Sequence, residues 1–89
     1  MEKVASMAGA VRTDAYLALL RALVRFRKEA GLSQAALAHR LDKPPSFVAK
    51  FELGERRLDV VELLVLLREL EVDPIELIPL LQDVLPKRL

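Results

Sequence analysis

Four basic side chains in the middle of this chain carry the chemistry that the sequence offers most plainly. Lys43, Lys50, Arg56 and Arg57 lie in a short stretch in which Ser46 adds a hydroxyl group. Ammonium and guanidinium groups bind phosphate, and a lysine can also donate to the O6 and N7 atoms of guanine. A serine hydroxyl can bond to a base or to a phosphate. A run of charged residues is more often a solvated face, so by themselves these side chains are only candidates for contact with phosphate.

Catalytic and metal chemistry have few residues to draw on. The chain has no cysteine and one histidine, His39, which we expect to be an exposed surface residue. A zinc site would need carboxylate ligands, and the sequence contains no such cluster. It also contains no glycine-rich loop for phosphate and no paired carboxylates beside an activating group. We therefore predict a protein that is not an enzyme and takes no cofactor, metal or small-molecule ligand.

The formal net charge of +1 conceals a division of the chain into a basic and an acidic part. Residues 1–57 carry 11 Lys and Arg against 6 Asp and Glu, whereas residues 58–89 carry 3 against 7. Such asymmetry indicates a basic working face and an acidic or neutral remainder. Chance segregation in a short chain is the alternative explanation.

No segment of the sequence is suited to a membrane. The first residues, MEKVASMAGAVR, contain no apolar run long enough for a signal peptide. A transmembrane helix needs roughly 18 apolar residues in a row, and charged residues interrupt the most apolar stretch, 60–81. We expect a soluble, cytoplasmic protein with no membrane partner, and the absence of cysteine fits a reducing compartment.

The elements that must position the basic side chains are all expected to be helices. Hydrophobic residues make up 53 % of the chain, and only three glycines and five prolines interrupt the pattern. Much of this hydrophobic content is Leu and Ala, which are strong helix formers. Apolar residues at helical spacing predict five helices, at about 14–30, at 34–41, from 45 to a stop at Gly54, at 60–70 and from 74 onward.

Capping residues and prolines set the expected helix boundaries. Residues that can cap a helix precede four of the five, namely Thr13 or Asp14, Ser33, Asp59 and Asp73. Gly31 follows the first helix, where a left-handed backbone is common. Pro44 breaks the chain, and Pro45 is expected at the first position of the third helix, where a missing N–H costs nothing. Pro74 opens the fifth helix in the same way, and Pro79 should kink it or end it early.

Two short helices joined by a tight turn, from Ser33 to Gly54, form a helix-turn-helix arrangement, although any small helical bundle contains such corners. The residues make the pattern specific. Gly31-Leu32-Ser33-Gln34 opens it, Leu37-Ala38, Leu41 and Ser46-Phe47-Val48 follow, and Phe51-Glu52-Leu53-Gly54-Glu55-Arg56-Arg57 closes it. Over about residues 15–78 the chain resembles the Cro/C1-type (XRE-like) helix-turn-helix family. The resemblance implies an all-α fold, a compact five-helix lambda-repressor-like DNA-binding domain, with its third helix in the major groove of double-stranded DNA.

The resemblance also implies roles for individual residues. The positions that would read bases are Pro45, Ser46, Phe47, Ala49 and Lys50. Gln34 would contact a phosphate and brace the recognition helix, and Ser33 adds a hydroxyl group at the same helix N-terminus. Arg27 and Glu52 match a pair that forms an ion pair between the first helix and the end of the third. Such a pair orients the helix more than it stabilises the fold.

Four basic residues flank the recognition helix where the DNA backbone should pass, namely Arg40, Lys43, Arg56 and Arg57. Lys43 precedes the helix, and Arg56 and Arg57 follow Gly54, where the family contacts phosphate. These contacts would make DNA affinity fall with salt. Three alternatives remain at this stage: Ser33 only caps its helix, Gln34 is merely solvated, and Phe47 is a second-layer core residue.

The recognition helix departs from the common family pattern at its start. Family members often carry glutamines at the positions of Pro45 and Ser46, and amides can make paired contacts to adenine. Pro45 has no donor, so its ring and that of Phe47 are left to pack on thymine methyl groups. With Ser46 and Lys50 as the polar readers, we expect apolar contacts, DNA shape and a second subunit to contribute to specificity.

The domain organisation follows from these elements. We expect a flexible arm at 1–13, the DNA-binding domain at 14–78 and a helical extension at 79–89 that forms a homodimer through the C-terminal helices. The function expected is a transcriptional regulator, a repressor of phage or bacterial genes that acts at an inverted-repeat operator in the nucleoid. Three alternatives are an activator, the antitoxin of a toxin–antitoxin pair, and an interaction module that has lost DNA binding.

Overall fold

The computed structural model describes residues 13–89, which form five helices and no strand. The helices are α1 (Asp14–Glu29), α2 (Gln34–Arg40), α3 (Ser46–Glu52), α4 (Val60–Glu69) and α5 (Pro74–Gln82). The all-α prediction is confirmed, and the predicted boundaries agree with the helices within one or two residues for the first four. The expected arm at 1–13 lies outside the described residues except for Thr13.

Side-chain caps start four of the helices at the predicted residues. The Thr13 hydroxyl oxygen accepts from Tyr16 N at 3.1 Å, and the Ser33 oxygen accepts from Ala36 N at 3.0 Å. Asp59 and Asp73 begin α4 and α5, each within a capping box. Because each cap satisfies N–H groups that the first turn leaves without partners, these boundaries depend on local sequence.

The turns between the first three helices use left-handed backbone where the sequence provides for it. Gly31, which follows α1, has φ 74° as predicted, and Asp42 has φ 57° in the turn between α2 and α3. Pro45 differs from the prediction by one position. It is the N-cap of α3 and not its first residue, although its φ of −55° and ψ of −32° are already helical. Phe47 N donates to Pro44 O at 2.9 Å, which closes the turn.

The last helix differs from the prediction in two ways. Pro79 lies inside α5, which continues to Gln82, so the expectation that Pro79 ends the helix early is wrong. The predicted helical extension over 79–89 is wrong beyond Gln82, since residues 83–89 contain no helix. Pro86 gives the physical reason, because the residue before a proline avoids the helical region. Val84 and Leu85 therefore do not belong to α5.

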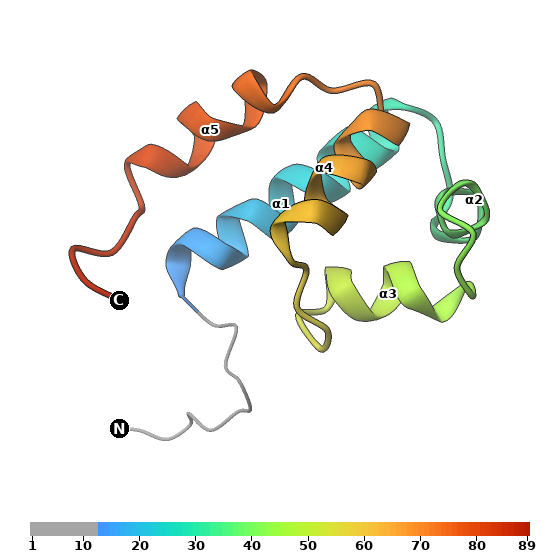
Figure 1. Ribbon diagram of the computed structural model, residues 1–89, viewed down its shortest axis with the longest axis horizontal. Helices are drawn as coiled ribbons and strands as arrows, with labels where there is room; N and C mark the ends of the chain where they lie inside the picture. Colours follow the sequence, from blue (N-terminus) through green and yellow to red (C-terminus); the bar gives the residue numbers. More distant parts are fainter. Residues whose placement is uncertain (1–12) are drawn as a thin grey trace.

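One core joins all five helices. In Figure 1, α1 passes through the middle of the molecule with α3 on one side and α5 on the other, and α1 packs against both. The largest fully buried side chains are Leu23 of α1, Leu37 of α2, Val48 and Phe51 of α3, and Leu66 and Leu67 of α4. Leu77 of α5 completes the core. Burial of these apolar side chains fixes α3 by its inner face and leaves its outer face to solvent.

The helices within residues 13–89 are short. The longest, α1, has 16 residues, and none is both long enough and apolar enough to cross a membrane.

Candidate nucleic-acid interface

Helices α2 and α3 pack against each other across the turn at 41–45, and α3 presents its outer face to solvent. Pro45, Ser46 and Lys50 are exposed, and Ala49 is half-buried. Ser46 and Lys50 are four residues apart, so that their side chains lie on the same face of α3. The structure therefore brings the predicted base-reading residues Ser46 and Lys50 to one exposed face, and Pro45 is exposed at the start of the helix.

The opposite side of α3 is tied to α1 by a buried ion pair. Arg27 Nε donates to Glu52 Oε2 at 2.6 Å, and Arg27 Nη2 donates to Glu52 Oε1 at 3.0 Å. The two side chains are only 9 % and 7 % exposed. Arg27 Nη1 also donates to Leu32 O at 3.0 Å, so the guanidinium holds the turn before α2 as well. Two opposite charges with so little exposure to solvent fix a geometry, because loss of either partner leaves an uncompensated buried charge.

Gln34, at the start of α2, belongs to the same network. Its Nε2 atom donates to Glu52 Oε1 at 2.7 Å, which links α2 to the end of α3. A glutamine amide carries two N–H donors, and Glu52 accepts from one of them. The interpretation of Gln34 as a merely solvated residue is wrong, because its side chain is half-buried and hydrogen-bonded. Arg27, Gln34 and Glu52 thus set the orientation of α3 relative to α1 and α2.

A second ion pair lies after α3. Arg56 Nη1 donates to Glu62 Oε1 at 3.0 Å, and Arg56 Nη2 donates to Glu62 Oε2 at 2.8 Å. The Arg56 guanidinium and the backbone N–H of Asp59 hold the pKa of the Glu62 carboxyl down at about 2, and the same pairing raises the pKa of Arg56. The Glu62 carboxylate is therefore ionised at neutral pH. The Arg56 guanidinium, which the sequence analysis assigned to phosphate, is paired with this carboxylate.

Phe47 lies between two of the basic residues. Its ring is half-buried and meets the Phe51 ring edge-on at a centroid distance of 5.8 Å. Arg56 Cζ lies 4.7 Å from the Phe47 ring centroid, and Lys43 Nζ lies 5.5 Å from it. The ring packs against the core and supports two cations. The structure thus places Phe47 where a second-layer core residue would lie, with less exposed surface for a base than Pro45, Ser46 or Lys50.

The remaining predicted phosphate ligands lie at the edges of this surface. Ser33 is exposed and uses its oxygen as the cap of α2, which leaves the hydroxyl hydrogen available for donation. Lys43 and Arg57 are exposed. Arg57 Cζ lies 5.5 Å from the Tyr16 ring centroid, and the Tyr16 hydroxyl accepts from Leu58 N at 3.0 Å.

Glu62 contacts Arg56 and Tyr16 contacts Arg57, and the sequence analysis predicted neither contact. Glu62 follows Asp59 by three residues, which is the spacing of a capping box and a signal that was present in the sequence. Tyr16 is 42 positions from Leu58, and no local sequence pattern predicts a hydrogen bond between them.

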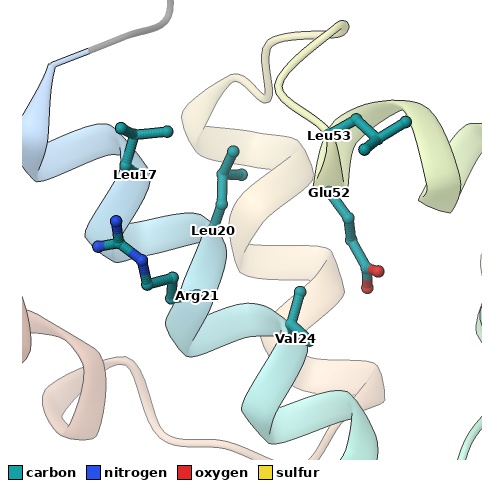
Figure 2. Close-up of a pocket in the computed structure, with 6 residues that line it drawn as sticks. All are labelled: Leu17, Leu20, Arg21, Val24, Glu52 and Leu53. Atoms are coloured by element: carbon teal, nitrogen blue, oxygen red, sulfur yellow. The ribbon is translucent and has the colours of Figure 1, made fainter.

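A pocket of about 280 Å³ lies behind the interface, between α1 and the end of α3. Figure 2 shows Leu17, Leu20, Arg21 and Val24 of α1 on one side and Glu52 and Leu53 on the other. Its lining is mostly apolar, and its acidic group, Glu52, is already paired with Arg27. Within residues 13–89, no group of three or more His, Cys, Asp or Glu side chains is placed to hold a metal ion.

Comparison with known proteins decides what this arrangement is. The family model described as helix-turn-helix matches residues 23–77, which include the Arg27 network, α2, α3 and α4. The chain belongs to the Cro/C1-type (XRE-like) helix-turn-helix family. As a member of that family it is a DNA-binding transcription regulator. The resemblance that the sequence indicated is confirmed, and so is the five-helix fold that it implied.

A solved structure supports the assignment over most of the chain. The chain is similar to a protein described as an XRE-family like protein from Pseudomonas syringae pv. tomato str. DC3000, with 44 % sequence identity and a TM-score of 0.73. The similarity covers 81 % of this chain and 88 % of that one. No curated protein matches the chain. The shared fold therefore covers most of both chains.

Proposed function

We propose that this helix-turn-helix protein is a transcriptional repressor that binds an inverted-repeat operator as a homodimer, with α3 of each subunit in the major groove. One observation carries the proposal. The exposed face of α3 with Ser46 and Lys50 is held by the Arg27–Glu52–Gln34 network on its other side. A reading helix needs such a fixed orientation, because base contacts discriminate only when side chains reach the groove in one register.

The residues proposed to contact DNA fall into two groups. Pro45, Ser46 and Lys50 lie where base edges would pass, and Phe47 would touch a base only with the exposed edge of its ring. Phosphate contacts are assigned to Ser33, Gln34, Lys43 and Arg57. The second N–H of the Gln34 amide would donate to a phosphate at the start of α2. The sequence analysis also assigned Arg56 to phosphate, but its pairing with Glu62 favours a different role.

The homodimer is proposed to form through the C-terminal helices. Ile75, Ile78 and Leu80 of α5 are exposed by 73 %, 54 % and 42 %. Ile75 and Ile78 are three residues apart and share one face of α5, and exposed apolar side chains that share a face are typical of a surface that binds a partner. A two-fold dimer would match the symmetry of two half-sites in duplex DNA. A cytoplasmic location at the nucleoid follows from the same proposal.

The experiment that tests this function is selection of duplexes from a random pool by the purified protein, followed by binding measurements on the recovered sequences. The proposal expects an inverted repeat with half-sites about one helical turn apart, and tighter binding to it than to mixed-sequence duplex. Sedimentation should give a dimer on the recovered duplex. A pool that shows no enrichment, or a single half-site bound by a monomer, would contradict it.

A further inference from the structure

Four side chains from four parts of the fold meet beside the recognition helix. Lys43 comes from the turn before α3, Phe47 from α3, Arg56 from the loop after α3, and Glu62 from α4. We call this set the Phe47 cluster. The cationic groups of Lys43 and Arg56 lie over the Phe47 ring, and both carboxylate oxygens of Glu62 accept hydrogen bonds from Arg56. The cluster therefore connects the two ends of α3 to the start of α4.

The Arg56 guanidinium uses three of its five N–H donors in hydrogen bonds to Glu62 and Arg57. Besides its two hydrogen bonds to Glu62, its Nη1 atom donates to Arg57 O at 2.9 Å. A planar guanidinium that pairs through its two Nη atoms and lies on an aromatic face has a defined position. Movement toward a DNA phosphate would break all of these contacts at once and leave the Glu62 carboxylate facing a polyanion.

Glu62 also controls the backbone that leads into α4. Its Oε1 atom accepts from Asp59 N at 3.0 Å, while its own N–H donates to Asp59 Oδ1 at 2.7 Å. The loop is held on its other side by α3, since Glu55 N and Arg56 N donate to Lys50 O at 2.9 and 3.3 Å. One carboxylate thus joins the side chain that covers Phe47 to the first turn of the following helix.

From this geometry we propose that Arg56 and Glu62 are positioning residues for DNA binding: their ion pair locks the loop at 54–58 onto α3 and so sets where Lys43 and Arg57 meet the DNA backbone, while Arg56 itself contacts no phosphate. The proposal rests on the DNA-binding function proposed above and changes the role that the sequence suggests for Arg56. It also assigns a part in DNA binding to Glu62, although its charge alone predicts repulsion from DNA.

The test is the salt dependence of DNA affinity for four single variants on one mixed-sequence duplex, because each lost phosphate contact lowers the slope of log K against log salt by about 1. For Arg56→Gln and Glu62→Gln we expect about a fivefold loss of affinity at every salt concentration, with the slope unchanged. Glu62→Gln keeps an oxygen for Asp59 N, so the capping of α4 survives. Arg57→Gln is the matched control and should lower the slope.

The fourth variant, Arg56→Lys, separates the two roles. A lysine keeps the positive charge for a phosphate, but it lacks the planar fork that pairs with both Glu62 oxygens. We therefore expect Arg56→Lys to lose affinity as Arg56→Gln does. In the double variant Arg56→Gln/Glu62→Gln the losses should not add, because both substitutions remove the same pair. Circular dichroism on each variant restricts the comparison to folded protein.

Three results would overturn the inference. A slope reduced by about 1 in Arg56→Gln, with rescue by Arg56→Lys, would make Arg56 a phosphate ligand. Tighter binding by Glu62→Gln would show that Glu62 competes with DNA for Arg56. Unchanged affinity in both variants would make the cluster irrelevant to binding. If the wild-type chain binds no duplex at low salt, the proposed function itself fails, which is distinguishable from these results.

Discussion

Arg27 of α1 and Glu52 of α3 are 25 positions apart in the chain and form an ion pair joined by two hydrogen bonds. Both side chains are less than 10 % exposed. Gln34 adds a third element through its bond to the same carboxylate. Loss of one member leaves the other charge buried without its partner, whereas an exposed pair loses little when it is broken. The pair therefore links the orientation of the recognition helix to the stability of the whole domain.

Glu52→Gln should destabilise the domain by about 3–5 kcal/mol, since it leaves the buried Arg27 guanidinium without a counter-charge. Urea unfolding followed by circular dichroism measures the change. The matched control is Arg25→Gln, which breaks an exposed pair with Glu29 on the same helix and should cost less than about 0.5 kcal/mol. Equal losses in the two variants would contradict the role given to the buried pair.

Lys50→Ala and Arg57→Ala should differ in kind. Lys50 faces the proposed groove, so its loss should change which duplexes the selection recovers and cost about 1–3 kcal/mol of discrimination at one base pair. Arg57→Ala should weaken binding to every sequence alike and make the salt dependence shallower. Binding curves on the preferred duplex and on a mixed sequence check both. If Lys50→Ala keeps the sequence preference of the wild type, the proposed position of α3 in the major groove is contradicted.

Acidification should remove the stabilisation that Glu62 provides. The pKa of this carboxyl is lowered from 4.5 to about 2 in the folded chain. A depressed carboxyl pKa stabilises the folded state above the unfolded value, and that contribution disappears as the pH falls from about 5 to about 2. Because both side chains are partly exposed, we expect a contribution of about 1 kcal/mol at pH 7. The unfolding free energies of the wild type and Glu62→Gln should converge over that interval, and a constant difference would contradict the assignment.

Charge placed on α5 should disrupt the proposed dimer. Ile75→Glu and Ile78→Glu introduce carboxylates on the exposed apolar face of α5, where burial in an interface would strip them of water. Sedimentation should show monomers for these variants at concentrations where the wild type is a dimer. Val60→Glu is the control, since Val60 on α4 is 71 % exposed and Ile75 is 73 % exposed. If Val60→Glu dissociates the dimer and the α5 variants do not, the interface lies on α4.

Local chemistry explains why so much of this fold could be predicted from the sequence alone. The caps at Thr13, Ser33 and Asp59 bond to N–H groups three residues away, and Gly31 adopts a left-handed φ directly after its helix. Each of these features is decided within one turn of helix, so pattern and residue type suffice. The continuation of α5 past Pro79 depends on packing of α5 against α1, which overrides a local preference.

What the sequence by itself determined is the number of helices, their caps and the helix-turn-helix family. Only the tertiary structure decided which contacts each basic residue makes. Arg56 and Arg57 are neighbours of the same type, yet Arg56 pairs with Glu62 on the next helix while Arg57 lies against Tyr16 of α1. The physical reason is range: a cap acts within its own turn, whereas an ion pair or a ring contact depends on which distant side chain the packed core brings within a few ångströms.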